Sequence, residues 1–188
     1  MEAILKKEII INKDLCKVIA VAVFVILTAL GAFVRIPLFF TPVPITLQTL
    51  FVLLSGAFLG SRLGGFSQIC YAVLGIAGIP LFTGSGSGLL YLSGPTSGYI
   101  FGFIFAAIFL GTFLKYFKSD FSTTFLLFCV ADILILVCGS LWIKQLFRCS
   151  LLNALTLGFI PFIVGDILKA LVATIIYSKL NSRFKEIF

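Results

Sequence analysis

The sequence contains no histidine and few charges, since only 11% of its 188 residues are Asp, Glu, Lys or Arg. Without histidine, catalysis by imidazole and most zinc sites are excluded. A soluble domain normally carries about 25% charged residues, so this chain cannot build a water-exposed surface of ordinary polarity. Taken with the sequence features described below, we expect no catalytic residue, no metal site and no cofactor.

Paired cysteines and a strong acidic component are also lacking. The five cysteines are an odd number and include no CxxC pair, so they predict neither a disulfide framework nor a zinc ribbon. Seven acidic residues face 14 basic ones, which gives a net charge of +7. The basic residues lie between apolar runs and are not interleaved with aromatic residues, which argues against a nucleic-acid partner.

A nucleotide-binding loop is missing as well. The chain has no GxxxxGKS or GxxxxGKT sequence, so it is not expected to bind ATP through a P-loop. The glycine- and serine-rich residues 84–88 have no predicted strand before them and no lysine directly after them. We interpret this stretch as a flexible external connection whose backbone can approach a ligand closely.

What the chain does contain is long apolar sequence, with 61% hydrophobic residues and a mean hydropathy of +1.22. About 20 apolar residues cross the roughly 30 Å of bilayer hydrocarbon. The sequence therefore predicts an all-α integral membrane protein, with residues 1–188 forming a single domain in the lipid bilayer. The six predicted transmembrane helices are residues 18–34, 45–60, 66–82, 96–114, 121–143 and 153–177.

The distribution of lysine and arginine predicts the orientation of these spans. With the N-terminus in the cytoplasm, ten basic residues lie in cytoplasmic segments and three (Arg35, Lys144 and Arg148) lie outside. Both termini are therefore expected to be cytoplasmic. Residues 1–17 carry charges of both signs and precede no small-residue cleavage site, so we expect a cytoplasmic lead-in and not a cleaved signal.

Three ionisable residues lie within the predicted spans, where each costs at least about 2.5–3.5 kcal/mol and commonly has a function. Asp166 and Lys169 are three positions apart, which puts them on one helix face. They are either part of a ligand site or an internal ion pair that only fixes helix packing. For Asp132, pairing with another span and a functional role are both open.

Other polar groups enter the outer halves of the predicted spans. Gln48 follows a proline-rich entrance, where Thr46 could cap the helix, and Thr96 precedes another span. Tyr71 and Tyr99 are either core aromatic residues or part of a site. Together these groups suit a small organic molecule that has an apolar body and hydrogen-bonding ends. A metal-ion path would need more carboxylates than the two available.

Four motifs, taken in order, give the sequence a family resemblance. They are PITLQT at residues 44–49, YxxxGxxGIPxF at 71–82, GPTSGYxxGF at 94–103 and PFxxGDxxK at 161–169. The chain resembles the BioY family, the biotin-binding S-components of energy-coupling factor (ECF) transporters. The resemblance implies a transport protein and not an enzyme. Such a protein spans a prokaryotic cell membrane several times and captures biotin from outside with high affinity.

The resemblance also implies site residues and partners. Asp166 is expected to accept hydrogen bonds from the ureido N–H groups of biotin, and Lys169 to donate to ligand oxygens. Further pocket residues implied by the motifs are Gln48, Tyr71, Thr96 and Tyr99. The expected partners are a transmembrane coupling protein and two cytoplasmic ATPase subunits. A weak small-residue patch for a helix contact consists of Ala22, Thr28, Ala29, Gly31 and Ala32.

The sequence departs from the family pattern in one loop, and several alternative functions stay open. The loop at residues 83–94 contains no Arg, Lys or Asn, so the partner of the biotin carboxylate is Lys169, a backbone nest or Arg35. Alternative functions are an S-component for another vitamin and a proton-coupled carrier that uses Asp166 or Asp132. A membrane enzyme is disfavoured, because this sequence offers no nucleophile–base pair. A purely structural subunit is a further alternative, and it would tolerate Asp166→Asn.

Overall fold

The computed structural model describes residues 13–117 and 120–187, and in this part the fold is helical, as predicted. The long helices are α2 (Lys13–Phe33), α3 (Gln48–Ile76), α4 (Ser97–Phe113), α5 (Phe121–Phe147) and α7 (Ile163–Ile187). Shorter elements are α6 (Leu151–Gly158), the 3-10 helices η1 (Leu89–Ser93) and η2 (Ile160–Phe162), and the strands β1 (Arg35–Ile36) and β2 (Ile45–Thr46).

Helix α3 reverses direction at Gly60, whose φ of 75° and ψ of −180° are accessible to glycine and strained for other residues. Its two arms, residues 48–59 and 61–76, lie antiparallel. The amide of Gln68 donates to the Ser55 hydroxyl at 3.0 Å across them. The chain therefore passes from the second to the third predicted span without a loop.

The third span is shifted relative to the prediction of 66–82. It starts directly after Gly60 and ends at Ile76, because Gly78 takes a φ of +108° and Pro80 has no N–H to continue the helix. Thr46, expected as the cap of the second span, lies in β2 instead, and Leu47 precedes the helix. Phe82, expected in the third span, forms an isolated bridge with Gly86.

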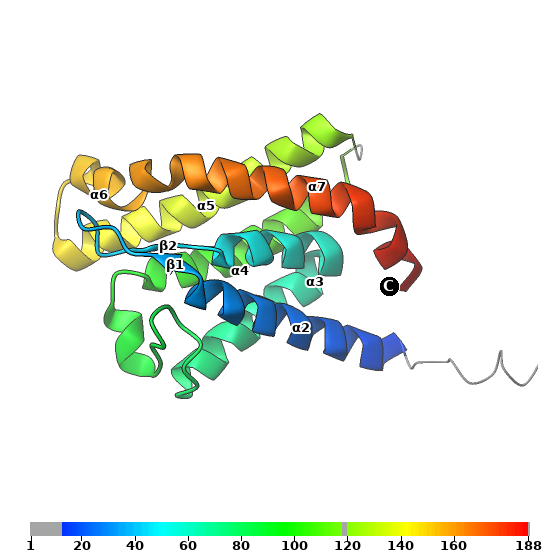
Figure 1. The fold of residues 1–188 in the computed structure, drawn as a ribbon, viewed down its shortest axis with the longest axis horizontal. Coiled ribbons are helices and arrows are strands. Elements are labelled where there is room, and N and C mark those ends of the chain that lie inside the picture. The colour runs from blue at the N-terminus through cyan, green and yellow to red at the C-terminus, as the bar shows by residue number, and fades with distance from the viewer. Residues whose placement is uncertain (1–12, 118–119, 188) are drawn as a thin grey trace, which may run out of the picture.

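The sixth span is not the continuous helix predicted over residues 153–177. Phe159, with φ −126° and ψ −60°, breaks the helix before Pro161, so α6 and η2 precede α7. Figure 1 shows α6 at one end of the bundle, beside the end of α5. The fifth span is longer than predicted, since α5 continues from 143 to Phe147 before Arg148 adopts a left-handed conformation.

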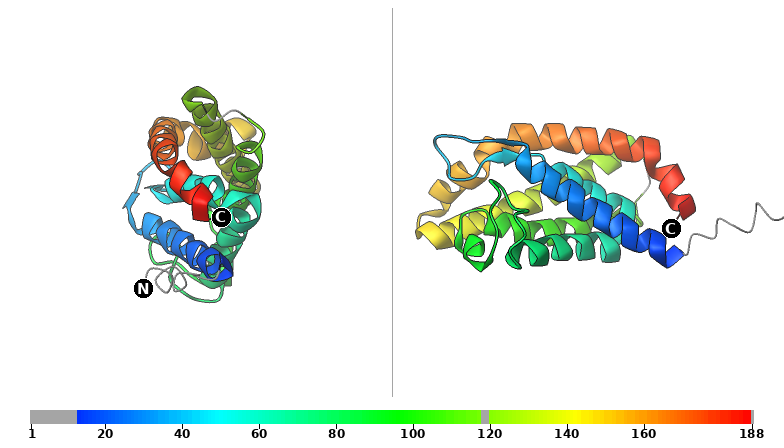
Figure 2. Two further views of the ribbon diagram at one scale, coloured as in Figure 1. Left: turned by 90° about the vertical axis from the view of Figure 1, so that its right-hand side faces the viewer. Right: turned by 60° about the horizontal axis from the view of Figure 1, so that its bottom comes forward.

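The helices run back and forth along the long axis of the molecule (Figures 1 and 2). Helix α4 lies between α3 and α5. Gly102 of α4 allows this close packing, because a Cβ atom there would lie only 2.9 Å from the Cα atom of Ile135. The start of α2 and the end of α7 lie at the same end of the bundle (Figure 1).

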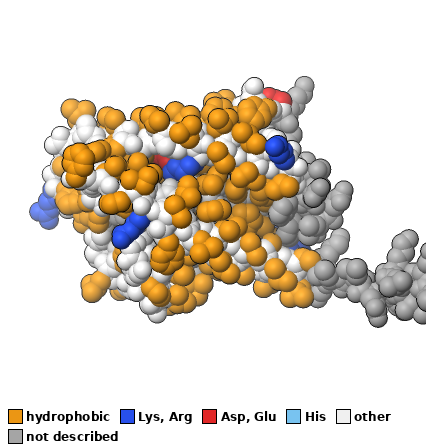
Figure 3. Space-filling view, in the orientation of Figure 1, with side chains coloured by type: hydrophobic (Ala, Val, Ile, Leu, Met, Phe, Trp, Pro, Cys, Tyr) orange, Lys and Arg blue, Asp and Glu red, His pale blue; other side chains and the backbone are white. Residues whose placement is uncertain are grey.

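The outer faces of the helices are apolar. Within residues 13–117 and 120–187, four helical segments are long and apolar enough to span a membrane, and a further apolar helix is shorter. The four are Asp14–Phe33, Gln48–Ile76, Phe121–Phe147 and Leu151–Asn181, and the shorter one is Ser97–Phe113. Large side chains such as Val18, Ile26 and Leu168 are 65%, 57% and 58% exposed. Hydrophobic side chains dominate the face in Figure 3. An apolar surface of this extent requires lipid as its solvent, so the protein is membrane-embedded.

Two expectations for the N-terminal region change. Of the predicted lead-in at 1–17, residues 13–17 belong to α2, where Lys17 pairs with Asp14 at 2.9 Å, and residues 1–12 lie outside the described part. In the small-residue patch, Thr28, Ala29, Gly31 and Ala32 are buried and only Ala22 is exposed. These buried residues pack inside the bundle. A Cβ atom at Gly31, for example, would lie 2.9 Å from the backbone nitrogen of Gln48.

Candidate ligand-binding site

A pocket of about 510 Å³, including its open side, lies near the end of the bundle opposite the start of α2. Both arms of α3 contribute to it, together with β2, α4, α5, α7 and the loop after α3. Six of the residues predicted from the sequence line this one pocket: Gln48, Tyr71, Thr96, Tyr99, Asp166 and Lys169.

One side of the pocket holds a buried ion pair. Asp166 and Lys169 are 4% and 9% exposed, and the Lys169 ammonium contacts the Asp166 carboxylate one helical turn away. The same ammonium donates to the backbone carbonyl of Thr46 at 3.0 Å. Because a carboxylate accepts about four hydrogen bonds, Asp166 retains acceptor capacity for a ligand beside a neutralising cation.

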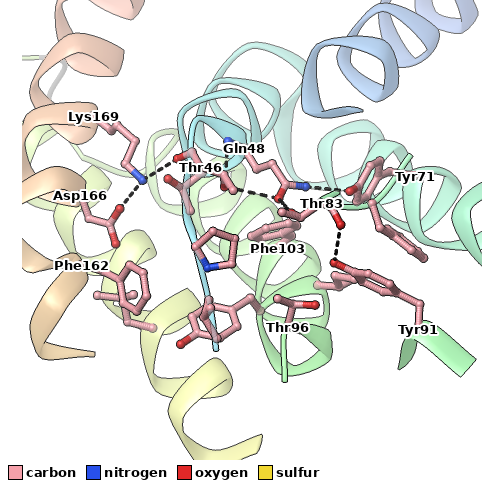
Figure 4. A pocket seen from close by; sticks show the side chains of 17 residues that line it. Thr46, Gln48, Tyr71, Thr83, Tyr91, Thr96, Phe103, Phe162, Asp166 and Lys169 are labelled. Atoms are coloured by element: carbon pink, nitrogen blue, oxygen red, sulfur yellow. Dashed lines mark hydrogen bonds and ion pairs between the residues drawn. The ribbon is translucent and has the colours of Figure 1, made fainter. Parts of the chain in front are cut away.

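Next to the ion pair, and joined to it through Thr46, lies a network of neutral hydrogen bonds centred on Gln48 (Figure 4). Its Nε2 donates to the Tyr71 hydroxyl at 2.7 Å, and its Oε1 accepts from the Thr83 hydroxyl at 3.1 Å. The Tyr71 hydroxyl in turn donates to the carbonyl of Leu81 at 3.1 Å. These bonds fix the orientation of the Gln48 amide, which is 5% exposed.

Aromatic rings form the apolar walls. The rings of Phe82 and Tyr91 stack with centroids 4.7 Å apart, and Tyr71 contacts Phe82 edge-on at 5.5 Å. Tyr99 contacts Phe162 edge-on at 6.2 Å. The Tyr99 hydroxyl donates to the carbonyl of Gly158 at 2.6 Å, so this residue offers its ring to the pocket while its hydroxyl ties α4 to α6.

Sequence reasoning missed several lining residues, above all Thr83 and Tyr91, which lie on either side of the glycine- and serine-rich residues 84–88 in the loop after α3. This loop is held in place, because the Gly88 nitrogen donates to the Gly75 carbonyl at 2.8 Å and residues 89–93 form η1. The signal available in the sequence was a threonine and a tyrosine at the edges of a glycine- and serine-rich stretch. Phe103, Leu136 and Val43 also line the pocket.

Asp132 lies outside this pocket. It is 3% exposed and lines a second, apolar cavity between α5 and α7 that also touches Asp166. Within residues 13–117 and 120–187, its Oδ1 atom has no hydrogen-bond partner and no cation forms a salt bridge with it. The charged partner on another span that the sequence suggested is therefore not found in this range.

The fold and this pocket define a class of protein: a membrane-embedded helical bundle that encloses a site for a small amphipathic molecule near one end. The chain belongs to the BioY family, whose sequence model matches residues 6–186.

Individual relatives agree with this assignment. The chain is 34% identical over 165 residues to a protein of Thermotoga maritima named biotin transporter BioY, covering 88% of this chain and 95% of that protein. It is 38% identical over 133 residues to biotin transporter BioY2 of Lactococcus lactis, covering 71% and 73%. The crystal structure of an S-component for biotin from an ECF-type ABC transporter superimposes with a TM-score of 0.86 at 26% identity, covering 92% of this chain and 94% of that one.

Proposed function

We propose that this protein is the biotin-binding S-component of an ECF-type ABC transporter, which captures biotin outside the cell and delivers it inward. Its function is transport and not catalysis. The observation that carries the proposal is the buried Asp166–Lys169 pair in an aromatic-walled pocket of a BioY-family chain. A site for a soluble ion would not need aromatic walls of this kind.

The pocket chemistry matches the two ends of biotin. Its ureido ring presents N–H donors and a carbonyl acceptor, which suit the Asp166 carboxylate and the Lys169 ammonium on one side of the pocket. The apolar bicycle and alkyl chain suit the rings of Phe82, Phe103 and Phe162. The Thr96 hydroxyl accepts or donates no hydrogen bond within the described residues and is available to a ligand.

Nanomolar affinity is attainable for such a ligand. Biotin has about 16 non-hydrogen atoms, and nanomolar binding at about −12.3 kcal/mol requires about −0.8 kcal/mol per atom. This value lies within the range for small ligands that a protein encloses well. The described polar network around Gln48 also supports tight binding, because its orientation is fixed before the ligand arrives.

The orientation and the partners are part of the proposal. Six membrane passes place both chain ends in the cytoplasm and the pocket toward the outside of a prokaryotic cell. Three basic residues support this topology, because they line a separate hollow beside the start of α2 and the end of α7, away from the pocket: Lys17, Arg62 and Lys115. Because the sequence has no P-loop, a transmembrane coupling protein and two cytoplasmic ATPase subunits supply the energy for transport.

Equilibrium binding of labelled biotin to the detergent-purified protein tests the proposal, with riboflavin and thiamine as competitors. We expect tight binding that neither competitor displaces and that Asp166→Asn weakens strongly. Asp132→Asn is the matched control, because it changes a buried aspartate outside the pocket lining. A folded protein that binds no biotin at micromolar concentration would refute the biotin assignment and direct the search to other vitamins.

A further inference from the structure

Arg35 lies next to the rim of the pocket, although it is not one of the lining residues. In the two-stranded sheet, Arg35 of β1 is paired directly with Thr46 of β2. Side chains that are directly paired in an antiparallel ladder lie on the same face, with Cβ atoms about 4.5–5.5 Å apart. Thr46 lines the pocket, and its carbonyl accepts the hydrogen bond from Lys169. The Arg35 side chain therefore starts one strand away from the ligand site.

The guanidinium of Arg35 then reaches the loop on the other side of the rim. A Cβ atom on Gly84, which has a φ of +76°, would lie 2.6 Å from Nη1 of Arg35. Because Gly84 has no side chain, the guanidinium of Arg35 can occupy the space beside its backbone. The preceding residue, Thr83, lines the pocket and donates to Gln48. The cation therefore lies beside Thr83 and the neutral hydrogen-bond network around Gln48.

This guanidinium is not used by the protein in the described range. Within residues 13–117 and 120–187, no acceptor receives a hydrogen bond from the Arg35 side chain and no carboxylate forms a salt bridge with it. The side chain is exposed. Its five N–H donors match a carboxylate in a bidentate geometry.

The other cation at the site has its partners already. Lys169 contacts Asp166 and the carbonyl of Thr46, and among the described residues no other cation lines the pocket. A ligand whose ureido end contacts Asp166 directs its far end toward Gln48, Thr83 and the loop beside Arg35. We propose that Arg35 binds the carboxylate of the ligand and makes the site selective for an acidic molecule over its neutral derivatives. This inference rests on the proposed function.

The test compares biotin with biotinamide, its neutral analogue, on the wild-type protein, Arg35→Gln and Arg35→Lys. We expect Arg35→Gln to weaken biotin by about tenfold to a hundredfold, the range for a lost charge-assisted hydrogen bond. The affinity for biotinamide should change by less than about twofold, and that retained binding also shows that the variant is folded. Arg35→Lys should lie in between for biotin, because an ammonium keeps the charge but not the planar fork.

Lys144→Gln is the control variant, because it removes one exposed positive charge from the end of α5 without touching the pocket lining. It should leave both affinities unchanged. The inference is overturned if Arg35→Gln leaves biotin binding intact, or if it weakens biotin and biotinamide equally. A wild-type protein that binds no biotin is a different result, since it refutes the proposed function itself.

Discussion

Gln48 and Tyr71 are 23 positions apart in the sequence, yet the Gln48 amide donates to the Tyr71 hydroxyl at 2.7 Å. The bond joins the outer ends of the two arms of α3, which the reversal at Gly60 brings side by side. It therefore links the shape of the hairpin to the geometry of the pocket, and a substitution at either place should affect the other.

Tyr71→Phe removes the acceptor of this bond and the donor to the Leu81 carbonyl. The buried Gln48 amide loses a partner, which costs about 1–3 kcal/mol. We expect a lower midpoint of thermal unfolding in detergent and weaker biotin binding. Tyr91→Phe is the control, because its longer bond to the Thr83 carbonyl, at 3.4 Å in a half-buried position, contributes less. Equal losses in both variants would contradict a special role for the Gln48–Tyr71 bond.

Gly60→Ala forces a side chain into a backbone conformation with φ 75° and ψ −180°. Strain of this kind costs on the order of 1–3 kcal/mol, so the hairpin of α3 should open or the protein should unfold at a lower temperature. Thermal unfolding followed by tryptophan fluorescence or circular dichroism measures the loss. Ser61→Ala is the control at the next residue, and it should be close to neutral. An unchanged stability of Gly60→Ala would show that the reversal does not depend on glycine.

Lys169→Met leaves the Asp166 carboxylate buried without its cation. Breaking a buried pair on one side costs about 3–5 kcal/mol, so this single variant should be less stable than the double variant Asp166→Asn/Lys169→Met. A double-mutant cycle on unfolding free energies in detergent measures the coupling. The single variants Asp166→Asn and Lys169→Met and the double variant should all lose biotin binding. Additive losses of stability would mean that the two side chains do not interact in the folded protein.

Asp132→Asn distinguishes vitamin capture from a proton-coupled carrier. Asp132 lines the second cavity and its Oδ1 has no partner in the described range. An amide is less costly to bury there than a carboxylate, so we expect unchanged or slightly raised stability and biotin affinity within about twofold of the wild type. In cells that contain the full transporter, uptake should persist in this variant and stop on depletion of ATP. Uptake that instead collapses with the proton gradient would favour the carrier.

The sequence by itself determined the solvent and the class of fold. A chain with 61% hydrophobic residues cannot hide its apolar side chains in water, and runs of this length fold as helices because lipid offers no partners to the backbone. The Asp166–Lys169 contact was also predictable, since a spacing of three positions on a helix brings side chains together whatever the rest of the fold does. That the predicted residues bind biotin stays a prediction.

The tertiary structure decided everything that depends on contacts between distant segments. The bond from Tyr99 to the Gly158 carbonyl spans 59 positions and removes a hydroxyl that the sequence offered to the ligand. The placement of Thr83 in the pocket and the approach of Arg35 to Gly84 belong to the same class. Helical periodicity reports only the neighbours within a few turns of one helix. Contacts between helices depend on how the apolar faces pack, which no single segment of sequence contains.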